Sequence, residues 1–124
     1  LGDGSIVWIA TYNTAPAGVV SFGPPLNPIP HPNPHGLTAC GEITMIYTLG
    51  QFYRLGVGTA LFRHACDCLK REGYTRIYLW VLEDNKKGRA FYERMGGHVV
   101  DNALQIATIG NAEFREIAYE WCLE

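Results

Sequence analysis

A pair of glycines at the start of a helix can bind a phosphate group when a strand leads into it. Here Gly56-Val57-Gly58 follows the apolar run Ile46–Leu49 and opens a helical pattern. Glycine lets the backbone approach an anion closely, and the free N–H groups of the first helical turn point at that anion. A plain turn between a strand and a helix is the alternative, because a glycine pair also serves that purpose.

Histidines and cysteines could bind a metal, but their spacing argues against it. His31 and His35 flank Pro-Asn-Pro, and two ligands in a proline-rich loop do not make a metal site. The cysteines, Cys40, Cys66, Cys68 and Cys122, fit neither a zinc pattern nor a secreted disulfide framework. We therefore expect no metal, and free thiols in a reducing cytoplasm.

The segments before the glycine loop have the composition of strands. Ser5–Ala10 and Ala17–Phe22 are β-rich runs separated by turn-forming residues, which predicts a hairpin. The segment 24–41 contains six prolines and is expected to be a long loop. Glu42–Thr48 is the next predicted strand, and simple alternation places Glu42, Thr44 and Ile46 on one face.

After the loop, helical and strand patterns alternate. An apolar stripe predicts a helix from Val57, with Lys70 and Arg71 in its last turn and Gly73 closing it. The almost wholly apolar run 76–81 is typical of a strand covered on both faces. A short helix at about 86–95 and two strands at about 103–108 and 113–121 complete the chain. The expected order is β-β-β-α-β-α-β-β, an α/β domain that spans residues 1–124.

Two segments resemble the motifs of one enzyme superfamily. The segment 46–61, Ile-Tyr-Thr-Leu-Gly-Gln-Phe-Tyr-Arg-Leu-Gly-Val-Gly-Thr-Ala-Leu, is similar to the main acetyl-CoA motif of the GNAT superfamily of N-acetyltransferases. Downstream, a strand followed by Asn85-x-x-Gly88-x-x-Phe91-Tyr92-Glu-x-x-Gly resembles the second motif of that family. The resemblance covers about 18–121, and it implies a single mixed, mostly antiparallel sheet with two helices.

The resemblance also implies acetyl-CoA as co-substrate and a set of residues that bind it. The strand end would hold the pantetheine arm and the acetyl oxygen through backbone N–H groups, and the glycine loop would hold the phosphates. Asn85 would cap the second helix, hydrogen-bond the pantetheine amide, or do both. The residues expected to bind the coenzyme are Ile46, Tyr47, Thr48, Tyr53, Arg54, Leu55, Gly56, Val57, Gly58, Thr59, Asn85 and Tyr92.

The implied reaction is direct attack of a primary amine, on a small molecule or a peptide, on the thioester. An alkylamine with a pKa near about 10.4 is mostly charged at pH 7, so a base must take its proton. Glu42 matches the position of a frequently catalytic glutamate; a partly exposed carboxylate in an ion pair is the alternative. Tyr92 matches the tyrosine that protonates the leaving thiolate, and a packed aromatic beside Phe91 is its alternative.

The sequence departs from the family pattern in three ways. Tyr53 replaces a usual Gln or Arg, and Gly97 replaces a usual aromatic residue. The strand and two helices that normally precede the hairpin have no counterpart, so the domain is expected to be short at its N-terminal side. The first strand would then expose an apolar edge, which predicts a homodimer. The alternatives to an active enzyme are a coenzyme-binding module without transferase activity, and a structural remnant whose first strands pair with another chain.

Composition narrows the classes of partner. The 124 residues are 48% hydrophobic and 18% charged, with a formal net charge of −2, as in ordinary folded domains. That charge gives no general reason to bind nucleic acid or an anionic membrane. No apolar run reaches the roughly 20 residues that a membrane helix needs, and no signal-peptide pattern is present. A cytoplasmic enzyme is the expectation.

Overall fold

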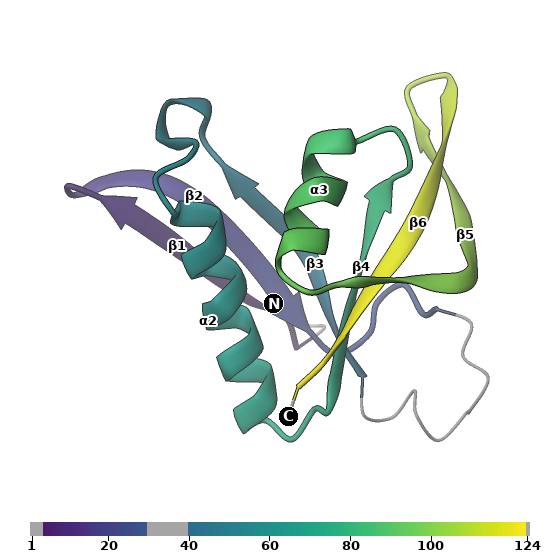
Figure 1. Cartoon of the computed structure of the whole chain (residues 1–124), viewed down its shortest axis with the longest axis horizontal. Coiled ribbons are helices and arrows are strands. Elements are labelled where there is room, and N and C mark those ends of the chain that lie inside the picture. Colours follow the sequence, from purple (N-terminus) through teal and green to yellow (C-terminus); the bar gives the residue numbers. More distant parts are fainter. Residues whose placement is uncertain (1–3, 30–39, 124) are drawn as a thin grey trace.

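Six strands form one twisted sheet with two α-helices in a computed structural model that describes residues 4–29 and 40–123 (Figure 1). The elements in chain order are β1 (Ile6–Tyr12), β2 (Ala15–Gly23), β3 (Cys40–Thr48), the 3-10 turn η1 (Gly50–Phe52), α2 (Val57–Arg71), β4 (Arg76–Leu82), α3 (Lys86–Arg94), β5 (His98–Ile109) and β6 (Ala112–Cys122). This order confirms the expected β-β-β-α-β-α-β-β arrangement.

The strands lie in the order β1-β2-β3-β4-β6-β5, and β3 and β4 are the parallel pair. The other neighbouring strands are antiparallel, as the expected mixed and mostly antiparallel sheet requires. A parallel connection needs a crossover, and α2 supplies it between β3 and β4. The strand before the glycine loop, β3, and the strand after it, β4, are therefore connected by one helix.

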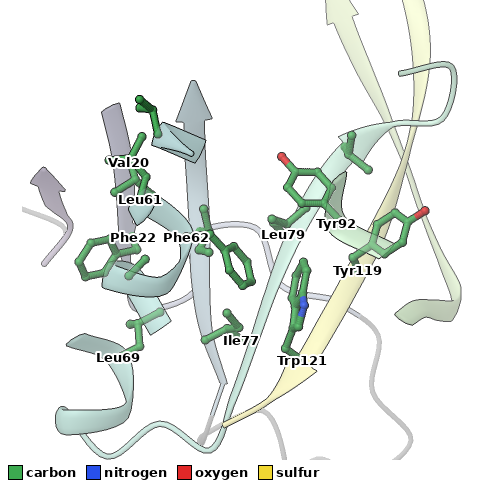
Figure 2. Close-up of a cluster of buried hydrophobic side chains, with 14 of the residues drawn as sticks. Val20, Phe22, Leu61, Phe62, Leu69, Ile77, Leu79, Tyr92, Tyr119 and Trp121 are labelled. Atoms are coloured by element: carbon green, nitrogen blue, oxygen red, sulfur yellow. The ribbon is translucent and has the colours of Figure 1, made fainter. Parts of the chain in front are cut away.

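Helix α2 covers the sheet with one apolar stripe. Its buried residues include Leu61, Ala65 and Leu69, which recur at the spacing of one helical face. They pack against Val20 and Phe22 of β2 and against buried residues of β3, β4 and β6 (Figure 2). Lys70 and Arg71 lie in the last turn of the helix, where the partial negative charge of the carbonyl end stabilises cations.

Strand β4 is buried on both faces, as its apolar sequence predicts. Ile77 and Leu79 belong to the core beneath the helices. Tyr78 belongs to a second buried cluster on the opposite face, with Cys40 and Val100 among its members. Two small cores thus meet at β4, which holds the middle of the sheet in place.

The expected placement of Glu42, Thr44 and Ile46 on one face is wrong, because β3 contains a β-bulge. Ser21 of β2 pairs with Met45, and the next residue pairs with Ile43, so Thr44 is an extra residue. The Thr44 hydroxyl donates to the Ser21 carbonyl and lies 3.0 Å from the Ser21 hydroxyl. Beyond the bulge the alternation is reset, so Ile46 packs against the core beneath the helices while Glu42 bonds to Tyr78 on the other side.

Strand β5 begins at His98, earlier than the expected residue 103. His98 and Val99 pair with β6, and the register then shifts before pairing resumes at Leu104. Asn102 has a positive φ of 62° inside this irregular stretch, and such a residue interrupts the alternation on which a strand prediction depends. His31 and His35 lie outside the described residues. Within the described part of the chain, no helix is long and apolar enough to cross a membrane.

Candidate active site

Among the described residues, strands β3 and β4 pair at their first residues and then separate. The paired residues are Cys40 with Arg76, Gly41 with Ile77, and Glu42 with Tyr78. Beyond this point the last residues of β3 face a gap, and Figure 1 shows the two strands moving apart toward their ends. The gap leads into a cavity of about 660 Å³ between the end of β3, the start of α2 and one face of α3.

The cavity is lined by nearly all the residues expected to bind a coenzyme. They are Ile46, Tyr47, Thr48, Tyr53, Arg54, Gly56, Val57, Gly58, Thr59, Asn85 and Tyr92. Leu55 is not part of the lining, and its side chain is exposed. Segments far apart in the sequence are therefore brought together, whereas the assignment of Leu55 to the site is not supported by its position.

The start of α2 provides backbone donors to this cavity. Gly56, the residue that caps α2, has φ +82°, a left-handed conformation that favours glycine, and its position carries no side-chain cap. The first N–H groups of a helix have no partner within the helix. Val57, Gly58 and Thr59 form that first turn and line the cavity, so the helix end offers backbone N–H groups of the kind that anions accept.

Helix α3 contributes two cations that the sequence analysis did not assign. Lys87 and Arg94 line the cavity, together with Arg54 of the loop, and none of the described lining residues is an aspartate or a glutamate. Residues 87, 91 and 94 recur at helical spacing, and this was the signal available in the sequence. Asn85 caps the helix, with its Oδ1 accepting from Gly88 N at 3.0 Å.

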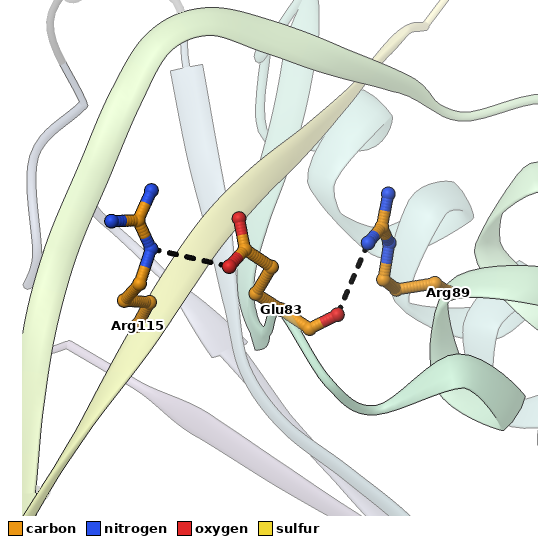
Figure 3. A network of polar contacts seen from close by, with 3 residues as sticks. All are labelled: Glu83, Arg89 and Arg115. Atoms are coloured by element: carbon orange, nitrogen blue, oxygen red, sulfur yellow. Dashed lines mark hydrogen bonds and ion pairs between the residues drawn. The ribbon is translucent and has the colours of Figure 1, made fainter.

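The opposite face of α3 is tied to the sheet. Arg89 donates to the Glu83 carbonyl at 3.1 Å, and the Glu83 carboxylate pairs with Arg115 of β6 at 3.1 Å (Figure 3). Arg89 Nε also donates to the Tyr119 hydroxyl, which in turn donates to Glu93 at 2.6 Å. These bonds fix the rotation of α3, so its other face is held toward the cavity.

Tyr92 is the buried residue of α3, and it is positioned by other aromatic rings. Its ring lies 5.9 Å from that of Tyr119 and 6.0 Å from that of Trp121. In Figure 2 its hydroxyl points away from Trp121. Burial raises the pKa of Tyr92 to about 12, since the charged form would lose its hydration. The phenol is therefore protonated throughout the neutral range.

Glu42 lies outside the cavity lining. Its side chain is 1% exposed, and its carboxylate accepts hydrogen bonds from Leu26, Asn27 and Tyr78. The expected alternative, a partly exposed carboxylate in an ion pair, does not describe it. The role of general base stays a prediction. In the described part of the chain, no group of three or more His, Cys, Asp or Glu residues could hold a metal ion.

Comparison with known proteins identifies the family of this chain. The model of the Acetyltransferase (GNAT) family matches residues 1–97, and the chain belongs to this family. A probable N-acetyltransferase of Mycobacterium tuberculosis is 31% identical over 93 residues, which are 75% of this chain and 47% of that protein. The chain thus spans about half the length of this relative.

Solved structures share the fold at lower identity. The ribosomal-protein-alanine N-acetyltransferase from Brucella melitensis has a TM-score of 0.78 at 16% identity, over 98% of this chain and 71% of that chain. The PaiA N-acetyltransferase from Thermoplasma acidophilum, in complex with coenzyme A, has a TM-score of 0.70 at 18% identity, over 96% and 61% of the two chains. At these identities the likeness supports the fold.

Proposed function

We propose that this protein transfers an acetyl group from acetyl-CoA to a primary amine. The observation that carries the proposal is the cavity where β3 and β4 separate, lined by the α2 N-terminus, three cations and a buried phenol. A helix end with nearby cations suits a pyrophosphate, and the gap beside β3 suits an extended pantetheine arm.

The expected reaction is direct transfer. The amine nitrogen attacks the thioester carbonyl carbon, the carbon–sulfur bond breaks, and the sulfur leaves as a thiolate. Backbone N–H groups at Ile46 and Thr48 would stabilise the developing oxyanion, since donors already in place need no reorganisation. The amine must also lose a proton, and Glu42 is the residue predicted from the sequence for that step.

Tyr92 is proposed to serve the leaving sulfur. Its pKa of about 12 lies above the roughly 8.5 of an ordinary thiol, so complete proton transfer from the phenol to the thiolate is uphill. A hydrogen bond from the phenol to the sulfur transfers no proton, so this difference in pKa does not oppose it. Tyr92 would therefore stabilise the thiolate as a donor, while water completes its protonation.

The acceptor is proposed to be an amine on a small molecule or a peptide. One structural neighbour is named for ribosomal protein alanine, which makes peptide α-amines a reasonable first choice. The test supplies acetyl-CoA with a panel of peptides and polyamines and measures release of free thiol. Transfer to at least one amine supports the enzyme. Binding of acetyl-CoA without transfer to any of them would instead support the binding-module alternative.

We also propose that the chain forms a homodimer through β1. This strand lies at the edge of the sheet, and its apolar side chains are exposed, to 63% at Ile9 and 48% at Val7. On the face opposite the helices, Ile9 lies level with Val19 and Tyr47, so one apolar row crosses three strands. Exposed apolar edges and faces of this kind tend to be covered by association.

Light scattering at several concentrations tests the dimer. The substitution Ile9→Lys places a charge on the edge strand β1 and should give a monomer. Thr108→Lys, at an exposed residue of β5 on the other edge of the sheet, serves as the control. A wild-type monomer at high concentration with a cooperative melt would overturn this proposal. We also propose a cytoplasmic location, a compartment that keeps thiols such as those of the four cysteines reduced.

A further inference from the structure

Glu42 stands at the point where the sheet opens. Its backbone pairs with Tyr78, and this is the last pair before β3 and β4 separate. A carboxylate is rarely this buried unless its charge is compensated by partners, since an unpaired charge in the interior is costly. The identity of those partners therefore shows what Glu42 does in the fold.

The partners come from a segment that precedes it by about fifteen residues. Glu42 Oε1 accepts from the backbone N–H groups of Leu26 and Asn27, at 2.7 and 2.8 Å. Its Oε2 accepts from the Asn27 side-chain amide at 3.0 Å. Two successive backbone donors around one carboxylate form an anion-binding turn, and hydrogen bonds to a charged group are the stronger kind.

The same segment is held by aromatic donors of β4. The Asn27 carbonyl accepts from Trp80 Nε1 at 2.8 Å and from the Tyr78 hydroxyl at 3.1 Å. The Tyr78 hydroxyl also lies 3.1 Å from Glu42 Oε1, so its proton is shared between the two oxygens. Ile29 is buried in the cluster around Tyr78, which closes the segment onto the sheet.

These hydrogen bonds occupy the carboxylate lone pairs of Glu42 that proton transfer would need. A general base needs a lone pair directed at the amine and a route for the proton to solvent. Among the described residues, Oε1 has three donors and Oε2 has one, and the residue is only 1% exposed. We infer that Glu42 is a positioning residue, which fixes the segment Leu26–Ile29 as a wall beside the opening between β3 and β4.

This assignment rests on the proposed function for its catalytic meaning. The helices cover one face of the sheet, so an amine would reach the opening from the other face, where the segment Leu26–Ile29 lies. The wall then limits how an acceptor approaches, and the amine proton leaves to water. The role of Asn27 is to join the carboxylate of Glu42 to the indole of Trp80.

The indole N–H signals in a ¹⁵N–¹H spectrum test the anchor without any activity measurement. Glu42→Gln turns one acceptor oxygen into a donor that opposes the N–H groups of the segment. We expect the Trp80 signal to move and its hydrogen exchange to quicken, while the signal of Trp121, which donates to Met95, stays in place.

Asn27→Ala removes only the side-chain bond and should move the Trp80 signal in the same direction by less. It covers the case in which Glu42→Gln does not fold. Glu113→Gln, at an exposed carboxylate, is the control.

The pH dependence of transfer separates positioning from base catalysis. If Glu42 is an anchor, Glu42→Gln and Asn27→Ala should both raise the acceptor KM, by about tenfold for a lost charge-assisted hydrogen bond, and leave the acidic limb of the kcat profile unchanged. An unmoved Trp80 signal together with loss of the acidic limb in Glu42→Gln would overturn the inference. If the wild type transfers no acetyl group but Trp80 responds as expected, the anchor stands and the proposed function fails.

Discussion

The indole ring of Trp121 fills the space beside Gly97. A Cβ atom on residue 97 would come within 2.5 Å of Trp121 Cζ2 and 3.0 Å of the Tyr92 carbonyl oxygen. Trp121 Nε1 also donates to the Met95 carbonyl at 3.2 Å, which fixes the ring at the end of α3. The space beside residue 97 is thus occupied by an aromatic ring from β6.

Gly97→Ala is expected to destabilise the protein because the new methyl group overlaps the indole ring. The loss of unfolding free energy should be about 1–3 kcal/mol, measured by urea denaturation. Gly50→Ala is a matched control, since a Cβ there meets no atom within 4 Å. Trp121→Leu in the Gly97→Ala background should cost less than the sum of the two changes. Additive costs would mean that the two residues are not coupled.

Gly58→Glu is expected to abolish acetyl-CoA binding. A Cβ at residue 58 makes only ordinary contacts, 3.5 Å from Thr48 Oγ1 and 3.6 Å from Phe91, so the fold should tolerate a side chain. Its carboxylate would stand in the proposed phosphate site, where charges about 4 Å apart repel by roughly 4 kcal/mol at an effective dielectric of 20. Calorimetry should show at least about a hundredfold loss.

The neutral isostere Gly58→Gln separates charge from bulk. It should bind acetyl-CoA more tightly than Gly58→Glu, and both variants should melt near the wild-type temperature. Equal affinity in Gly58→Glu and the wild type would remove the phosphate site from the start of α2.

Lys87→Ala and Arg94→Ala are each expected to weaken acetyl-CoA binding by about two- to fivefold, because exposed charge pairs contribute up to about 1 kcal/mol. The affinity should also depend less on ionic strength in these variants, since one screened charge has been removed. Titration calorimetry at two salt concentrations measures both effects. Arg63→Ala, an exposed cation of α2 outside the cavity, is the control. An affinity that falls equally in all three variants would point to net charge alone.

Tyr92→Phe is expected to keep acetyl-CoA affinity and lower kcat by about ten- to a hundredfold, since a donor to the leaving sulfur is lost. The raised pKa of Tyr92 means that its phenol is neutral at every pH below about 11. The wild-type rate should therefore not fall between pH 8 and 10 through this group. If turnover holds in Tyr92→Phe but the melting temperature drops by many degrees, Tyr92 is a packing residue.

The proposed coenzyme cavity was predictable because its lining residues fall in two continuous motifs. The glycine loop and the Asn85-to-Tyr92 segment carry local signals, and the fold brings them together. The bulge at Thr44 left no such signal, because it depends on how β2 aligns with β3. Two partners of Glu42, Leu26 and Asn27, lie 16 and 15 residues away in a proline-rich segment, and alternation within one strand says nothing about them.

The short parallel pairing between β3 and β4 affects how easily the sheet opens locally. The sheet consists of two antiparallel halves, β1-β2-β3 and β4-β6-β5, and three residue pairs join them within the described part of the chain. A pantetheine arm lying in the gap would act as an added strand, bridging both halves where the backbone has no partner of its own. Bound acetyl-CoA would then be part of the scaffold as well as the substrate, and it would raise the cost of local opening. Amide protons of Ile46 and Thr48 should exchange more slowly once it is bound, and those of β4 should follow, although that strand lies across the gap.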